Sequence, residues 1–164
     1  SFWWNELATD WAYFTPQGET HPKYAAVHRY AAYIIDGMNH WMTGFVDWNF
    51  ALDSIGGPNH VQNYCGACLM VDYGQDIIYY TPYYYVLKQL SRTMRPGDIA
   101  LGVSETNNEN LFVSAARRAD GQVTVQILNK SKEAIVFPLQ VGELAAKVTA
   151  PANSVKTVIL PVNK

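Results

Sequence analysis

The sequence predicts a fold in two parts, α/β followed by all-β, and two patterns carry this prediction. Over residues 1–96, short apolar runs alternate with two segments whose apolar residues recur at helical spacing. Over residues 97–164, apolar and polar residues alternate, and turn residues separate the runs. The change of period follows the breaker Pro96-Gly97. We therefore expect residues 1–96 and 97–164 to form separate domains.

The first part is predicted as strand, helix, strand, helix. Residues 2–6 and 42–46 are apolar runs typical of buried strands. Residues 22–38 form an amphipathic helix that begins at a proline, and a second helix begins at Thr81-Pro82 in the same way. Between them, residues 69–72 form a short extended segment before a turn at Gly74. This order implies parallel strands joined by right-handed crossovers.

Two such units cannot cover both faces of their strands and would leave open sheet edges. They fit the last two units of a (β/α)8 TIM barrel, units seven and eight. The chain also begins inside a predicted core strand, with no turn or cap before residue 2. We therefore expect a C-terminal fragment of a longer protein.

The second part is predicted as C-terminal antiparallel β-sandwich strands. Asp120-Gly121 is a two-residue hairpin turn, and a further turn follows at 129–131. Residues 155–160 make a final strand. The buried face is expected to come from alternating apolar residues, namely Leu111, Val113, Ala115, Val123, Val125, Ile127, Ile135, Phe137 and Leu139.

Composition narrows the possible functions. The hydrophobic fraction of 49% and charged fraction of 16% indicate a globular protein. A net charge of −2 argues against a nucleic-acid partner, which would need a basic surface. No apolar run approaches the ~20 residues of a membrane span. Aromatic residues make up 13% of the chain, with five Trp and eleven Tyr, as in many carbohydrate-active proteins.

Neither the cysteines nor the histidines predict a metal site or a cofactor. Cys65 and Cys68 form one C-x-x-C pair, whereas a zinc ribbon needs two pairs and a redox motif should open a helix. Two buried or surface thiols are the favoured interpretation. His21, His28 and His40 lie near one helix without a cluster of carboxylates.

The most informative stretch is 44–63, GFVDWNFALDSIGGPNHVQN. The apolar run before it ends in Asp47-Trp48-Asn49, and a Gly-Gly-Pro breaker leads to a second polar cluster at 59–63. An indole offers a flat apolar face with one N–H donor, and carboxylates and amides bind hydroxyls in pairs. The stretch therefore predicts a surface that faces sugar.

The pattern D-W-N-x-A-L-x-x-x-G-G-P-N-x-V-x-N, which begins at Asp47, resembles the glucosylceramidase group of glycoside hydrolase family 30. The resemblance implies a (β/α)8 barrel with an attached β-sandwich. It also implies two catalytic glutamates, an acid/base after the fourth barrel strand and a nucleophile at the end of the seventh.

The resemblance assigns roles to six residues. Glu6 ends the strand before the Asp47 strand and takes the role of nucleophile, while the acid/base has no counterpart in this chain. Trp48 is expected to contact the sugar, and Asp47 and Asn49 to hold the loop beside the substrate. Asn63 corresponds to a residue that reaches the substrate pocket, and His60 occupies the position of an aromatic residue near the entrance.

The function that follows is that of a retaining β-glucosidase acting on glucosylceramide or β-glucan-like substrates, without a cofactor. Its expected partners are the carbohydrate or glycolipid substrate and the N-terminal remainder of the same protein. The resemblance implies a secreted or extracytoplasmic location and leaves a role for a membrane surface open. The alternatives are a non-catalytic carbohydrate-binding or interaction module, and a remnant without separate function.

Overall fold

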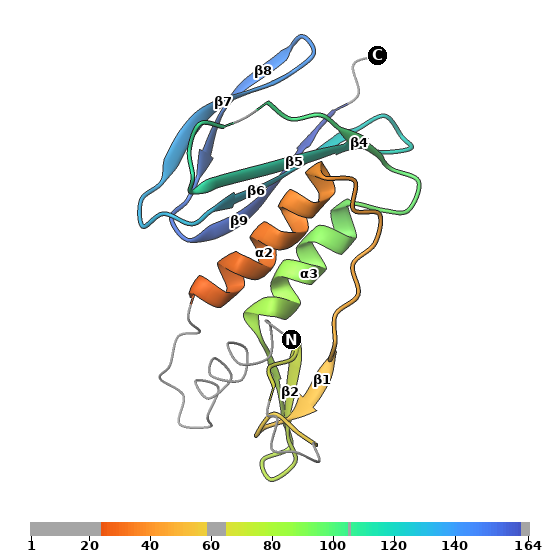
Figure 1. The fold of residues 1–164 in the computed structure, drawn as a ribbon, viewed down its shortest axis with the longest axis vertical. Coiled ribbons are helices and arrows are strands. Elements are labelled where there is room, and N and C mark those ends of the chain that lie inside the picture. The colour runs from red at the N-terminus through yellow and green to blue at the C-terminus, as the bar shows by residue number, and fades with distance from the viewer. Residues whose placement is uncertain (1–23, 59–64, 105, 162–164) are drawn as a thin grey trace. The chain divides into compact units, whose positions relative to one another are not determined.

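The computed structural model describes residues 24–58, 65–104 and 106–161. The chain divides into two compact units (Figure 1). The first comprises Ser1–Tyr30 and Phe45–Lys88, and the second comprises Ala31–Gly44 and Gln89–Lys164. Helices α2 (Tyr24–Asn39) and α3 (Pro82–Thr93) each contribute residues to both units. Neither of these helices is long and apolar enough to span a membrane.

The first unit contains a small mixed sheet in the order β1-β2-β3. Strand β1 (Ala51–Asp53) pairs in parallel with β2 (Leu69–Asp72), and β2 pairs antiparallel with β3 (Ile77–Tyr80). The prediction at 69–72 is confirmed as β2. Strand β3 was not predicted, and the four-residue connection at 73–76 accounts for its antiparallel direction, because a parallel crossover needs a much longer segment.

The predicted strand at 42–46 is wrong. The segment has no strand assignment, and the first strand after helix α2 in the described residues is β1, which begins at Ala51. The side chain of Val46 is 95% exposed. An apolar run becomes a strand only where a neighbour accepts its hydrogen bonds, and no described strand pairs with 42–46. The predicted strand at 2–6 lies outside the described residues.

The second unit contains a four-stranded antiparallel sheet and a two-stranded hairpin. The sheet has the order β4-β5-β6-β9, from β4 (Ile99–Leu101), β5 (Leu111–Arg117), β6 (Val123–Asn129) and β9 (Ser154–Leu160). The hairpin consists of β7 (Ile135–Val141) and β8 (Leu144–Ala150). The predicted all-β character of residues 97–164 is confirmed in their described part, although β4 and β8 were not predicted.

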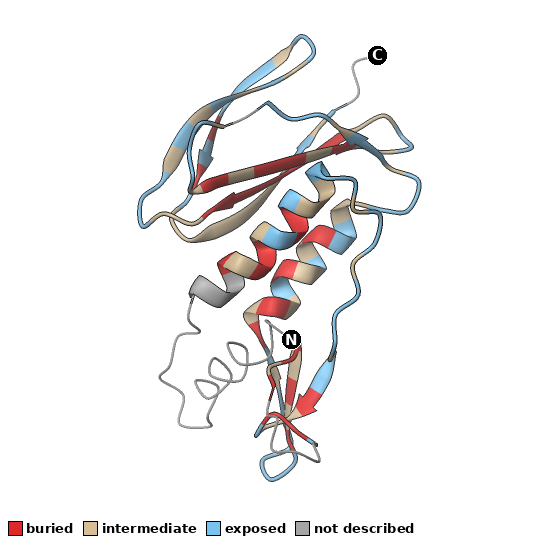
Figure 2. Ribbon diagram, in the orientation of Figure 1, coloured by how far each residue is buried: buried red, intermediate tan, exposed pale blue. Residues whose placement is uncertain are grey.

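The hairpin and the sheet share one hydrophobic core. Its buried members lie on β5, β6 and β8, namely Leu111, Val113, Val123, Val125, Ile127, Val148 and Ala150. Alternate residues of β5 and β6 point into this core, as the sequence pattern predicts. Figure 2 shows β5 and β6 buried along most of their length, whereas β7 and β8 carry many exposed positions.

Every residue of β6 is buried, so its second face is covered as well. On that face Gln126 accepts a 2.7 Å hydrogen bond from Thr157 of β9 and donates to Thr93 of helix α3. Gln89 of α3 donates to Thr157 at 2.9 Å. Gln126 can occupy this buried face because Thr93 and Thr157 satisfy its amide across the helix and the sheet.

Candidate functional site

Three of the six predicted site residues lie in the described part of the chain. Asp47, Trp48 and Asn49 follow one another in the irregular segment before β1, with a bend at Trp48, in the first unit. Glu6, His60 and Asn63 lie outside the described residues.

The carboxylate of Asp47 is bound on both oxygens. Its Oδ2 accepts a 2.8 Å hydrogen bond from the phenol of Tyr30, and its Oδ1 accepts one of 2.9 Å from the backbone N–H of Trp48. Tyr30 is 4% exposed, and its ring makes edge-on contacts with Phe45 and Tyr83. Burial, and next the charge of Asp47, raise the pKa of Tyr30, so the phenol keeps its proton and acts as the donor.

Trp48 lies next to this fixed carboxylate and is 74% exposed. An exposed indole presents both an apolar face and an N–H group, which suits the alternating C–H and O–H surfaces of a sugar. A cavity of about 30 Å³ lies beside it, lined by Tyr30, Asp47, Trp48, Asn49, Cys65, Gly66, Ala67 and Tyr83. A cavity of this size has room for about one water molecule, so the described residues alone do not enclose a pocket of the size of a sugar.

The loop that follows β1 is shaped by Asp53, which the sequence analysis did not single out. Its Oδ1 accepts hydrogen bonds from the N–H groups of Ile55 at 3.0 Å and Gly57 at 2.7 Å. Gly56 has a φ of 83°, which favours glycine, and its carbonyl accepts from the N–H of Cys65 at 3.0 Å. The sequence could have revealed this role of Asp53, because it stands two and four residues before the backbone amides that it binds, and Asp side chains often bind nearby backbone N–H groups in turns.

The two cysteines are buried thiols, in agreement with the favoured interpretation. Burial, and next the charge of Asp47, raise the pKa of Cys68 to about 11, and burial also raises the pKa of Cys65. A thiol with a raised pKa is a poor nucleophile. Both residues therefore have a packing role. Cys65 belongs to a hydrophobic cluster with Leu52, Ala67 and Met70, and Cys68 is 1% exposed.

The α/β unit, followed by antiparallel sheets and with an anchored carboxylate and an exposed indole before β1, fits the barrel portion and sandwich domain of a glycoside hydrolase. The chain belongs to glycosyl hydrolase family 30. Residues 8–94 match the family's TIM-barrel domain and residues 99–158 match its beta sandwich domain.

Curated relatives carry the name glucosylceramidase. "Putative glucosylceramidase 4" of Caenorhabditis elegans is 30% identical over 153 residues, which cover 90% of this chain and 29% of that protein. The lysosomal acid glucosylceramidase of Mus musculus is 30% identical over 130 residues, which cover 79% of this chain and 25% of that protein. The chain thus spans less than a third of the length of these relatives.

The fold is also found in solved structures. SrfJ from Salmonella typhimurium superposes with a TM-score of 0.79 at 25% identity, over 86% of this chain and 31% of that chain. The endo-beta1,6-glucanase BT3312 superposes with a TM-score of 0.70 at 21% identity, over 79% of this chain and 29% of that chain. These structures support the assignment of a barrel portion followed by a β-sandwich.

Proposed function

We propose that this chain is the C-terminal part of a retaining β-glucosidase of the glucosylceramidase type. Residues 1–96 supply the last two barrel units and residues 97–164 supply sandwich strands. The observation that carries the proposal is the exposed indole of Trp48 beside a carboxylate whose two oxygens are anchored. The names of the relatives in worm and mouse favour a glucosyl headgroup on a lipid as the substrate.

In this proposal Glu6 is the nucleophile. A retaining enzyme needs an ionised carboxylate to attack the anomeric carbon, and a protonated one about 5–5.5 Å away to protonate the leaving oxygen. The carboxylate oxygen forms an ester bond to the sugar while the glycosidic bond breaks, and water then hydrolyses the ester. We expect the acid/base after the fourth barrel strand, outside residues 1–164, so these residues alone are proposed to be inactive.

Trp48, Asp47 and Asn49 take supporting roles. Trp48 contacts the glucose ring, and Asp47 holds the backbone at Trp48 through its bond to the N–H of that residue. Asn63 and His60 are proposed to extend the same wall. Sequestering the sugar against an indole strengthens the hydrogen bonds that position it, because the local dielectric falls when water leaves.

The test compares the protein that carries this chain and its upstream barrel units with its Glu6→Gln variant, using an aryl β-glucoside. We expect turnover to fall by roughly 10³-fold or more. The matched control is Glu143→Gln, which changes an exposed glutamate in the β7–β8 turn and should leave turnover unchanged.

A second measurement locates the nucleophile directly. A fluorinated aryl glucoside that traps the glycosyl-enzyme should add the mass of one sugar to the peptide containing Glu6. Label on a different carboxylate would remove Glu6 from the mechanism. If the protein binds glucosides but neither hydrolyses them nor takes up label, the non-catalytic carbohydrate-binding alternative holds instead.

A further inference from the structure

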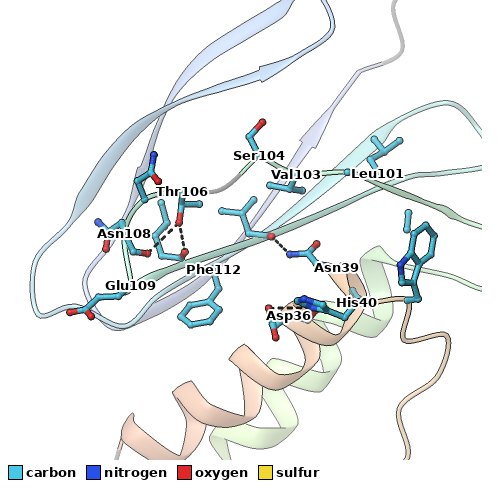
Figure 3. Close-up of a pocket in the computed structure, with 17 residues that line it drawn as sticks. Asp36, Asn39, His40, Leu101, Val103, Ser104, Thr106, Asn108, Glu109 and Phe112 are labelled. Atoms are coloured by element: carbon cyan, nitrogen blue, oxygen red, sulfur yellow. Dashed lines mark hydrogen bonds and ion pairs between the residues drawn. The ribbon is translucent and has the colours of Figure 1, made fainter.

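A second cavity lies in the other unit, between the C-terminal end of helix α2 and strands β4 and β5. Its volume is about 750 Å³, within the range of small-molecule sites. Its lining combines an exposed tryptophan with short polar side chains. Figure 3 shows Asp36, Asn39 and His40 at the helix end and Phe112 on β5. No predicted site residue belongs to this lining.

The helix ends in a way that places Trp41 at this cavity. The N–H of Met42 bonds to the carbonyl of Gly37 at 2.8 Å, which is the six-to-one bond of a Schellman motif. The side chain of Met42 lies against Gly37, where an added Cβ would meet its Cε at 2.9 Å. In this motif the residue before Met42 adopts a left-handed conformation, and Trp41 does so with a φ of 67°.

Tryptophan is an unfavourable residue for that position in two independent ways. Glycine is the usual residue there, because a Cβ is strained at positive φ. The indole is also 89% exposed, so packing against the described residues offers little compensation. A strained backbone that carries an exposed aromatic side chain is the kind of outlier from which a functional role can be inferred.

The polar groups around Trp41 are held in place. Nδ1 of His40 donates to the carbonyl of Asp36 at 2.9 Å and lies 3.5 Å from its Oδ1, so Nε2 of the neutral ring remains an acceptor. Nδ2 of Asn39 donates to the carbonyl of Val113 at 2.8 Å, which ties the helix end to β5. Across the cavity Thr106 donates to the carbonyl of Leu111 at 2.9 Å.

The charges of the lining define the ligand class. The described lining contains two carboxylates, on Asp36 and Glu109, and neither lysine nor arginine. Lys130 lies nearby but sits over the Phe112 ring, 4.5 Å from its centroid. Phosphates, sulfates and uronic acids would therefore be repelled, whereas a neutral sugar gains hydroxyl partners from the carboxylates, amides and imidazole.

We propose that this cavity is an accessory binding site for neutral β-linked oligosaccharides, with Trp41 as its stacking platform. The site lies in the sandwich-bearing unit and would hold a glycan without cleaving it. Its described lining shares no residue with that of the cavity beside Trp48.

The test uses isothermal titration of the full chain with a β-linked glucose trisaccharide, in a Trp48→Ala background that removes binding at the predicted active-site wall. We expect binding that weakens by about tenfold or more in Trp41→Gly, because the aromatic surface is lost. Trp41→Gly should also raise the melting temperature, because glycine relieves the positive φ. A variant that binds more weakly but melts at a higher temperature shows that Trp41 serves binding and not packing.

Trp41→Ala is the matched variant, because it removes the indole but keeps the strained backbone. It should lose binding to the same extent as Trp41→Gly without the gain in melting temperature.

An acidic control, a trisaccharide of galacturonic acid, should bind at least about tenfold more weakly than the neutral sugar. The proposal is overturned if the parent chain does not bind, if Trp41→Gly binds normally, or if the acidic sugar binds equally well. In the protein that also carries the upstream barrel units and keeps Trp48, Trp41→Gly should hydrolyse a small aryl glucoside at the unchanged rate, so failure of the accessory site and failure of the proposed function are told apart.

Discussion

The phenol of Tyr30 donates a 2.8 Å hydrogen bond to Oδ2 of Asp47, so a buried group on helix α2 holds the carboxylate that precedes Trp48. The donor is itself fixed, since its ring centroid lies 5.4 Å from that of Phe45 and 5.2 Å from that of Tyr83. Because the other oxygen of Asp47 binds the N–H of Trp48, the orientation of the backbone at the indole depends on Tyr30. We interpret Asp47 as a positioning residue.

Replacing Tyr30 by Phe should separate this hydrogen bond from the packing of the ring. We expect the free energy of unfolding to fall by about 1 kcal/mol, at the low end for a bond to a charged group because Asp47 is exposed. Urea denaturation measures the change. Tyr73→Phe is the control, because Tyr73 is 82% exposed and its variant should stay within about 0.5 kcal/mol. Equal losses in the two variants would mean that the Tyr30–Asp47 bond contributes nothing specific.

The raised pKa of Cys68 predicts a loss of stability at alkaline pH. The folded thiol titrates at about 11 and the unfolded one at 9.0, so both keep the proton below pH 9.0 and stability is unaffected there. Between these values the unfolded state binds fewer protons, and stability falls as pH rises, by up to about 1.4 kcal/mol per pH unit. Cys68→Ala should make the fall between pH 9.0 and about pH 11 shallower.

Tyr30 provides the control for this measurement. Its pKa is also raised, but from 10.0, so its contribution to stability begins to be lost only above that pH. Tyr30→Phe should therefore leave the pH slope unchanged below pH 10.0, whereas Cys68→Ala should change it there. A slope that is insensitive to Cys68→Ala would show that the thiol is not shielded from water in the folded state.

Trp48→Ala should affect catalysis without affecting stability. The side chain is 74% exposed, so its loss should change the free energy of unfolding by less than about 0.5 kcal/mol. In the proposed enzyme kcat/KM for an aryl β-glucoside should fall by at least about tenfold, because the sugar loses its aromatic contact. Tyr73→Ala removes another exposed aromatic residue and should leave kcat/KM unchanged. A large loss of stability in Trp48→Ala would indicate a packing role instead.

The sequence predicted the elements whose signals are local. Both helices begin at or near a proline and have apolar residues at helical spacing. Helix α2 lies within two residues of its predicted bounds, and α3 begins at the predicted Pro82. The two hairpin-forming strands β5 and β6 follow from alternation and from the Asp120-Gly121 turn. These features depend on residues close together in the chain, which is why a single sequence reveals them.

The errors and omissions arise where a distant partner decides the outcome. Residues 42–46 are apolar but have no described strand beside them, and a strand cannot form without a neighbour. Strand β8 was missed because only Val148 and Ala150 along it are buried, too few to produce an alternating pattern. The bond from Tyr30 to Asp47 joins residues 17 positions apart, and the left-handed conformation of Trp41 contradicts its residue type.

The side chain of Asn129 joins the ends of three segments in the second unit. Replacing its amide nitrogen by an oxygen, as in Asn129→Asp, should therefore strongly lower the stability of the protein. It is fully buried at the end of β6. Its Nδ2 donates to the carbonyls of Glu133, Ala150 and Pro151 at 2.8, 3.0 and 2.9 Å. Its Oδ1 accepts from both the N–H and the hydroxyl of Ser131, each at 2.8 Å. An amide satisfies all of these partners, because it is a donor on one side and an acceptor on the other.

Asn129→Asp keeps the volume but turns an anionic oxygen toward three carbonyl oxygens. We expect a loss of more than about 3 kcal/mol at neutral pH, because the second oxygen of the buried carboxylate faces three carbonyl oxygens and has no donor, and thermal unfolding measures this loss as a lower melting temperature. In the variant the carboxyl should have a raised pKa, so part of the stability should return as the pH falls and the acid gains a proton to donate.

Asn108→Asp is the matched control. Asn108 is exposed, its Oδ1 accepts from the N–H of Asn110 at 3.0 Å, and a carboxylate can accept that bond equally well. A loss in Asn129→Asp no larger than in Asn108→Asp would mean that the second unit does not depend on this buried amide.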